Sequence, residues 1–447
     1  MEDKSLVSAP IGPLIKHIAI PASVGFFFNT MFNVVDTFWG GKLGTESLAA
    51  MSASFPVFFI IIALASGISS ASSALIANAL GQKNEQHAKE YYLVSVLLGI
   101  VISIVLTIIG LLAAKLLFQT LGISGSTLTF ALDYTYVIFY GTAFFILAGI
   151  LNSYLTAIGD SKTYRNALIA SCILNIVLDP WFMYGGFGVP ALGLKGIALA
   201  TILLQLMQCI YIGMKVRKQQ ILQGFRELAF NFKIVKEIIT QSIPASLSMT
   251  TVAIGSFIIT YFIAKYGDAA VAAYGTAVRI EQIVLLPTIG LNIAVLALIG
   301  QNNGAKRFDR VREIMRTSMK YGSYMAILAL VLIIAEGRLM MKIFSDDPEV
   351  VRIGSVYLYF AAFIFLAYVI LFCYGSALQG LKKPGMSLVI SIARQIILPL
   401  AAFYPIVFIF ELPITYVWAS ILVITWIAAL FIYMAFKKKL AQEEDKA

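Results

Sequence analysis

Long apolar segments separated by short polar loops run along the whole chain. Each segment is long enough to cross a hydrocarbon core of about 30 Å as a helix that rises about 1.5 Å per residue. The pattern therefore predicts an all-α polytopic membrane protein. We expect twelve transmembrane helices, over residues 14–38, 48–76, 91–118, 128–158, 166–187, 193–214, 236–264, 270–298, 319–343, 353–380, 386–411 and 413–436.

Composition agrees with this class. The chain has 447 residues, of which 60% are apolar and 13% charged, and its mean hydropathy is +0.88. Soluble domains are about half apolar and about a quarter charged. The first apolar run is too long for the core of a cleavable signal peptide. Cys172, Cys209 and Cys373 lie inside apolar segments without a metal-binding spacing. We therefore expect no metal and no cofactor apart from a transported ion.

The basic residues are distributed unevenly between the two sides of the predicted bundle. The side that holds both termini carries 24 Lys and Arg residues, the opposite side carries 7, and 2 lie within segments. The positive-inside rule then places both termini in the cytoplasm. We expect the membrane to be a bacterial-type cytoplasmic (inner) membrane. The net charge of +10 thus reflects topology, and we expect no nucleic-acid partner.

The chain repeats itself. The tetrapeptide IPAS occurs at residues 20–23 and again at 243–246, an offset of 223 residues. Lys42 corresponds to Lys265 at the same offset. Each repeat has six segments, so both repeats enter the membrane from the same side. We expect two six-helix lobes related by a pseudo-two-fold axis along the membrane normal, with substrate bound between them. The N-terminal lobe would span residues 1–215, the linker 216–235 and the C-terminal lobe 236–447.

The first apolar segment combines a carboxylate with a proline. Asp36 lies fifteen residues after Pro21. An Asp at the centre of a transmembrane helix costs roughly 2.5 to 3.5 kcal/mol and usually marks an ion or proton pathway. Pro21 removes one backbone donor and provides a place where the helix can bend. The alternative is a hydrated Asp36 near the outer end of the helix, without a role.

A second carboxylate lies in segment five. Asn175 and Asp179 are four residues apart and share one face of a helix. The alternative is that Asp179 and Pro180 simply end the helix. The corresponding positions of the second repeat are apolar, so coupling to a cation is expected in the N-terminal lobe. Those positions are Ile259, Ile396 and Leu400.

Four further charged residues of the predicted segments are candidates for a role. Asp133 is expected at the outer interface, where hydration is easy. Arg279 and Glu281 are two residues apart, do not face each other on a helix, and are interpreted as structural. Arg394 is expected to meet carbonyl groups or a carboxylate of the C-terminal lobe.

Several stretches resemble the multidrug and toxic compound extrusion (MATE) family, in its DinF-like branch. They are PASVGFFFNTMFNVVDTFWGGKLG, AIGDSKTYRN, LNIVLDPWFMYG, GLKGIALAT and ALQGLKKPG. The resemblance implies two six-helix lobes around a central cleft, and export of cationic amphipathic compounds against an inward flow of protons or sodium ions. It also implies a coupling site at Asp36, Asn175 and Asp179.

The same resemblance implies polar residues around that cavity at Tyr134, Asn152 and Thr201. Other branches of the family place an acidic residue in segment seven. Here segment seven has only Glu237, at its cytoplasmic end. A coupling site in the C-terminal lobe is therefore not expected.

These observations predict a proton-coupled multidrug antiporter, acting as a monomer in the lipid bilayer on organic cation drugs. A desolvated Asp needs only a proton to become neutral, whereas a hard cation needs several oxygen ligands. Sodium coupling and a flippase for lipid-linked precursors remain as alternatives; a flippase of that kind would need embedded Arg or Lys. An enzyme is not expected, because the chain has no HExxH, no GxSxG in a helix context and no P-loop.

Overall fold

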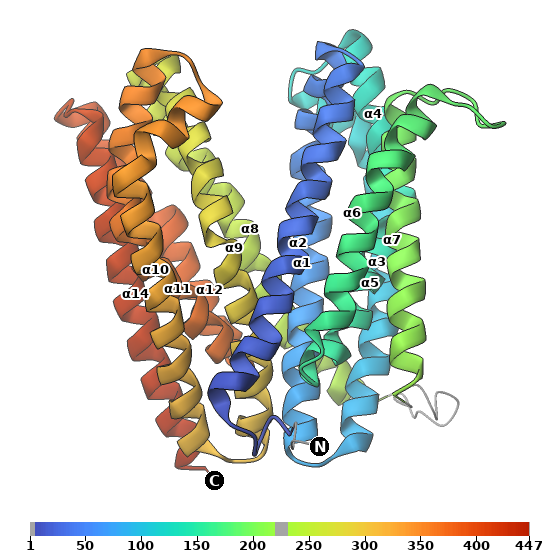
Figure 1. Ribbon diagram of the computed structural model, residues 1–447, viewed down its shortest axis with the longest axis vertical. Helices are drawn as coiled ribbons and strands as arrows, with labels where there is room; N and C mark the ends of the chain where they lie inside the picture. Colours follow the sequence, from blue (N-terminus) through green and yellow to red (C-terminus); the bar gives the residue numbers. More distant parts are fainter. Residues whose placement is uncertain (1–4, 220–230, 447) are drawn as a thin grey trace. The chain divides into compact units, whose positions relative to one another are not determined.

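The computed structural model describes residues 5–219 and 231–446. Within these residues the chain is helical, without a β-strand, and a single isolated bridge joins Gly186 and Val189 (Figure 1). The helices are α1 (Ile11–Lys42), α2 (Thr45–Gly81), α3 (Glu85–Thr120), α4 (Gly125–Tyr140), α5 (Thr142–Ala157), α6 (Ser161–Tyr184), α7 (Leu194–Arg217), α8 (Phe232–Ile263), η2 (Ala264–Tyr266), α9 (Asp268–Gly304), α10 (Phe308–Phe344), α11 (Pro348–Gly380), α12 (Pro384–Ile392), η3 (Ala393–Ile397), α13 (Leu398–Tyr404), η4 (Pro405–Ile409) and α14 (Ile414–Glu444).

The twelve predicted segments correspond in order to these helices, and the prediction of an all-α polytopic membrane protein is confirmed. In the described part of the chain, ten helices are long and apolar enough to cross a membrane, and eleven when the pair α4 and α5 counts as one span. α10, which contains the predicted ninth segment, is 37 residues long and carries charged residues mainly in its first half.

Two predicted segments are less regular than expected. The fourth is bent by 44° between α4 and α5, at Gly141. Gly141 packs against the side chain of Ile202 on α7, where a Cβ atom would overlap. The eleventh segment contains two π-helical turns, η3 and η4. Because a π-helical turn shifts the direction of the side chains that follow it, these turns re-aim residues of the segment.

The chain forms two compact units. The N-terminal unit comprises Val24–Ser246, and the C-terminal unit comprises Leu247 onward together with the residues up to Ser23. These boundaries differ from the predicted lobes, because α1 and α8 each contribute one half to each unit. The predicted linker, 216–235, includes 220–230, which lies outside the described residues.

Side-chain contacts explain this division of α1 and α8. Arg310 Nη2 donates to the backbone oxygen of Ala9 at 2.7 Å, and Asn302 Nδ2 donates to that of Leu6 at 3.0 Å. These bonds hold the start of the chain to α9 and α10. In the N-terminal unit, the hydroxyl of Tyr91 donates to Glu237 Oε2 and holds the start of α8 to α3.

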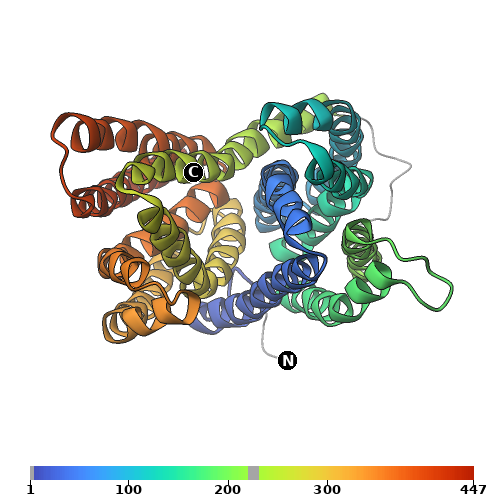
Figure 2. The same ribbon diagram turned by 90° about the horizontal axis from the view of Figure 1, so that it is seen from above.

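Each unit has its own apolar core. The core of the C-terminal unit includes the fully buried side chains of Trp418, Tyr357 and Phe365. The core of the N-terminal unit is divided into several clusters. The helices around them run side by side, as the end-on view in Figure 2 shows.

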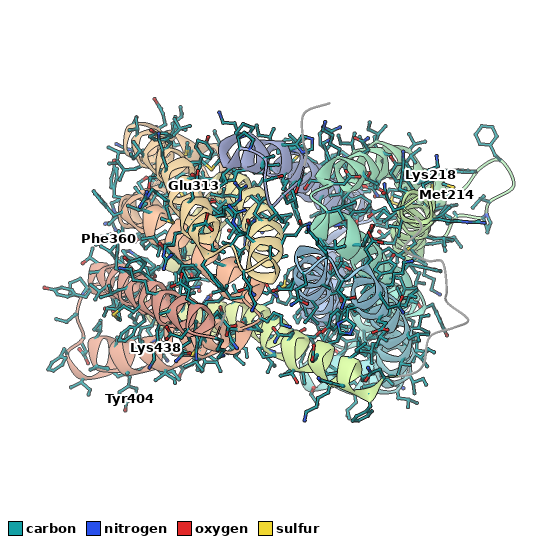
Figure 3. The ribbon with its side chains drawn as sticks, turned by 90° about the horizontal axis from the view of Figure 1, so that it is seen from below. Met214, Lys218, Glu313, Phe360, Tyr404 and Lys438 are labelled. Carbon is teal, nitrogen blue, oxygen red and sulfur yellow. The ribbon has the colours of Figure 1, made fainter. Side chains whose placement is uncertain are left out.

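Within the C-terminal unit α1 begins and α14 ends at the same end (Figure 1). Basic side chains lie at helix ends, with Lys218 after α7 and Lys438 near the end of α14 (Figure 3).

Candidate functional site

Two carboxylates meet inside the N-terminal unit. Asp36 extends from α1 and Asp179 from α6, and Asn175 of α6 connects them. The Asn175 Nδ2 atom lies 2.9 Å from Asp36 Oδ1 and 2.8 Å from Asp179 Oδ1. The two carboxyl groups also lie within hydrogen-bonding reach of each other. On α7, Thr201 Oγ1 lies 3.3 Å from Asp36 Oδ2 and 3.0 Å from its own helix at Ile197 O.

These four polar residues, the acidic cluster, are almost fully buried. The exposed fraction is 6% for Asp36, 3% for Thr201 and 0% for both Asn175 and Asp179. Two acceptor atoms in the cluster, Asn175 Oδ1 and Asp179 Oδ2, have no hydrogen-bond partner among the described residues. Two buried carboxylates this close cannot both remain ionised without a compensating positive charge. The cluster is therefore chemically suited to take up and release a proton or a small cation.

The geometry of α6 places this chemistry inside a helix. Asp160 caps the helix, accepting hydrogen bonds from the Thr163 backbone nitrogen at 3.1 Å and from its hydroxyl at 2.6 Å. The helix continues past Pro180 to Tyr184, so the alternative in which Asp179 and Pro180 end the helix is wrong. Asp36 is buried, so the alternative of a hydrated side chain does not describe this structure, and its role in coupling stays a prediction.

Apolar layers enclose the acidic cluster on both sides. Toward the start of α1, Phe32, Cys172 and Leu204 form a buried cluster, about one turn from Asp36, Asn175 and Thr201 respectively. On the other side, Tyr134 and Ile197 belong to a second buried cluster. The acidic cluster therefore lies between two apolar layers and has little exposed surface.

The remaining predicted residues lie at different distances from the acidic cluster. Tyr134 is buried and close enough to interact electrostatically with Asp36 and Asp179. Asn152 Nδ2 instead lies 3.3 Å from Thr156 Oγ1 on its own helix, and among the described residues it makes no hydrogen bond to the cluster. Pro21 lies fifteen residues before Asp36 in the same continuous helix, about 22 Å away along its axis.

A third buried carboxylate, Glu281 of α9, lies in the C-terminal unit. It is 5% exposed, and the Tyr357 hydroxyl lies 3.1 Å from its Oε1 atom. The rings of Tyr357 and Trp418 pack beside it with centroids 4.8 Å apart. Arg394, in the π-helical turn η3, interacts electrostatically with Glu281 and lies over the Tyr368 ring at 5.6 Å.

The sequence interpretation assigned Glu281 a structural role and missed its aromatic surroundings. The available signal was a carboxylate thirteen residues into an apolar helix. The other two charged residues, Asp133 and Arg279, are not buried as Glu281 is. Asp133 forms an ion pair with Lys195 at 3.1 Å, partly exposed. Arg279 is exposed, and among the described residues it forms no ion pair and no hydrogen bond.

Comparisons with known proteins give a consistent result. The profile of the MatE family matches the chain twice, over residues 21–181 and 244–404, so the matches are offset by 223 residues like the IPAS repeat. A protein from Bacillus subtilis, described as the probable multidrug resistance protein YoeA, is 30% identical over 70% of this chain and 69% of its own length.

A protein from Shewanella oneidensis described as an FAD transporter is 28% identical over 90% of both chains. Among solved structures, a transporter of the MOP superfamily from Pyrococcus furiosus superposes with a TM-score of 0.91. It is 24% identical and covers 99% of both chains; its binding pocket is described as having reverse polarity, which suggested a different function. At this identity the structural match establishes the fold.

Proposed function

Because the chain belongs to the MatE family, whose members are membrane transporters and not enzymes, we propose that it is a proton-coupled multidrug antiporter. It exports cationic amphipathic compounds in exchange for protons that move inward. The observation that carries this proposal is the buried pair Asp36 and Asp179, joined by Asn175. The relative YoeA, described as a multidrug resistance protein, supports the substrate class.

The acidic cluster supplies a reason for exchange. When the carboxylate pair carries net negative charge, it attracts an organic cation; when it binds a proton, that attraction is lost. Proton entry and drug retention then exclude each other. An antiporter requires this exclusion, because simultaneous occupation would dissipate the gradient without exporting drug.

The orientation of Asn175 supports protons over sodium. Both hydrogens of its amide group are directed at the carboxylates, and the same hydrogens would repel a metal ion placed between them. A hard cation in a protein site generally needs about six oxygen ligands. A proton needs only the two carboxyl groups that already lie within hydrogen-bonding reach.

Transport by the purified chain in liposomes tests the proposal. Ethidium serves as the organic cation, and a pH gradient or a sodium gradient is imposed separately. We expect the pH gradient alone to drive transport, and Asp36→Asn to abolish it with the protein still folded. The matched control is Asp133→Asn, which makes the same chemical change at the partly exposed ion pair with Lys195. Transport driven by sodium alone, or equal loss in both variants, would contradict the assignment.

An anionic substrate is a second candidate, and Arg279 is the observation that favours it. Its side chain is exposed eleven residues into α9, about 16 Å from the start of the helix. An exposed guanidinium at that depth needs water or an anionic partner. The relative described as an FAD transporter makes a flavin nucleotide the first anion to test, and a lipid-linked phosphate the second. Anion transport that is lost in Arg279→Gln, without ethidium transport in the wild type, would replace the drug proposal.

We further place both termini in the cytoplasm and the chain in a bacterial cytoplasmic membrane, as a monomer without a cofactor. The excess of Lys and Arg on the side of the termini supports this orientation. Labelling of a cysteine introduced at Lys218, after α7 (Figure 3), tests it. A membrane-impermeant reagent added to intact cells should leave that position unlabelled.

A further inference from the structure

The chain passes between its two units at two places. These are the peptide bonds Ser23–Val24 and Ser246–Leu247. Both lie inside continuous helices, α1 and α8, and not in loops. Each follows an interior proline by two residues, Pro21 or Pro244. Any movement of one unit against the other must therefore be absorbed by these two helices.

Immediately before its crossing, α1 is packed backbone to backbone against α9. A Cβ atom at Gly290 would lie 2.8 Å from the backbone nitrogen of Ser23, and it would also meet the carbonyl oxygen of Ala19. Ser23 Oγ lies 3.1 Å from the carbonyl oxygen of Pro287 and donates to it. Small residues let helices in a membrane approach this closely, and the serine hydroxyl adds a hydrogen bond between them.

The same contact occurs in the other repeat. A Cβ atom at Gly67 of α2 would lie 2.6 Å from the backbone nitrogen of Ser246 and 2.8 Å from its Cα atom. Gly67 and Gly290 are 223 positions apart, as are Ser23 and Ser246. The same close contact between a serine and a glycine therefore occurs twice, at the two points where the chain passes from one unit to the other.

On α1 the stretch free to bend is very short. After the crossing, Gly25 packs against α6, where a Cβ atom would lie 3.1 Å from Arg165 Cα and 3.2 Å from Leu168 Cδ1. Only Val24 separates Gly25 from Ser23. The missing N–H of Pro21 leaves the hydrogen-bond ladder incomplete just before this point. Bending of α1 is thereby confined to about one turn.

We propose that the contacts of Ser23 with Gly290 and of Ser246 with Gly67 are the two pivots of the transport cycle. These contacts position the crossing helices and take no direct part in binding a proton or a drug, because none of these residues belongs to the acidic cluster. Each pivot fixes the first half of a crossing helix to one unit. A displacement of the second half of that helix would then rotate the other unit about the pivot. On α1 that second half carries Asp36. The inference rests on the proposed transport function only for its activity readout.

Alanine at either glycine tests the pivots, because one methyl group forces the two backbones apart. We expect Gly290→Ala and Gly67→Ala to lower ethidium transport by about tenfold or more, since displacements of about 1 Å at positioning contacts have effects of this size. The matched control is Gly275→Ala on α9, where a Cβ atom meets no described atom within 4 Å. That variant should transport like the wild type.

A second readout separates a pivot from ordinary packing. Spin labels at Lys42 and Lys265, exposed equivalent positions in the two units, report the distance between the units at acidic and alkaline pH without any drug. The wild type should show a pH-dependent change of distance that Gly290→Ala reduces and that Gly275→Ala retains.

Ser23→Ala keeps the proposal testable if Gly290→Ala does not assemble. It removes the hydroxyl without adding volume and should also reduce the distance change. Its control is Ser52→Ala, whose exposed hydroxyl bonds only to its own helix at Leu48 O. A full distance change in Gly290→Ala or in Ser23→Ala would overturn the pivots. A wild type that changes distance but exports no drug would overturn the proposed function and leave the pivots standing.

Discussion

Replacing Asn175 by leucine should disable the site while keeping its volume. The amide of Asn175 donates to both Asp36 and Asp179, and leucine fills similar space without a donor. Each hydrogen bond to a charged group contributes about 1.5 to 3 kcal/mol. Losing two costs the ionised form of the pair about 3 to 6 kcal/mol, which corresponds to a factor of about 10² to 10⁴ in its population. The cluster should then remain protonated and fail to exchange.

The assay is ethidium transport under a pH gradient, together with a count of protons released by detergent-purified protein after an alkaline jump. Asn175→Leu should lose at least about a hundredfold in transport rate, by the arithmetic above, and should release fewer protons. Asn166→Leu is the matched control, since exposed Asn166 lies on the same helix and its side chain bonds to the neighbouring Arg165. Near-normal transport by Asn175→Leu, or the same loss in Asn166→Leu, would refute the reasoning.

Three further outcomes follow from the contacts. Thr201→Val removes a hydroxyl shared between Asp36 and Ile197 O, so it should weaken transport by less than about tenfold, consistent with one hydrogen bond of about 1 kcal/mol. Glu281→Gln keeps an acceptor for Tyr357, so the rate of proton-driven ethidium transport should stay within about twofold of wild type if this carboxylate has a structural role. Pro21→Ala should impair ethidium transport much more than Pro244→Ala at similar protein levels, because Asp36 lies on α1 whereas its counterpart on α8 is Ile259; equal losses would exclude a special role for bending of α1.

The helices themselves were predictable from local pattern. Apolar runs of membrane-spanning length contain their own hydrogen-bond partners, so each run forms a helix whatever its neighbours are. The bend at Gly141 was not predictable, because the apolar run from 128 to 158 is unbroken in sequence. It is associated with the close approach of Ile202, which only a glycine permits. The π-helical turns were missed because sequence spacing does not mark where an extra residue enters a helical turn.

The acidic cluster was predictable in part. Spacing alone places Asn175 and Asp179 on one face of α6. That this face meets Asp36 followed from the resemblance to a family, because periodicity does not say which helices are neighbours. The predicted segment, 166–187, already ran past Pro180, but the sequence alone did not exclude that Asp179 and Pro180 end the helix. A proline weakens a helix without always ending it, and in this case the helix extends to Tyr184.

The division of α1 and α8 between units lay beyond sequence reasoning for a related reason. A continuous apolar helix gives no sign that its two halves pack in different places. Both repeats have the same local arrangement at the crossing: a proline, a serine and a facing glycine, at the same offset. They do not share the chemistry, since the residue that matches Asp36 is Ile259. The two crossings are therefore equivalent, and only the first has a carboxylate in the second half of its helix. In the proposed exchange, the coupling step would then act through α1, and α8 would follow passively.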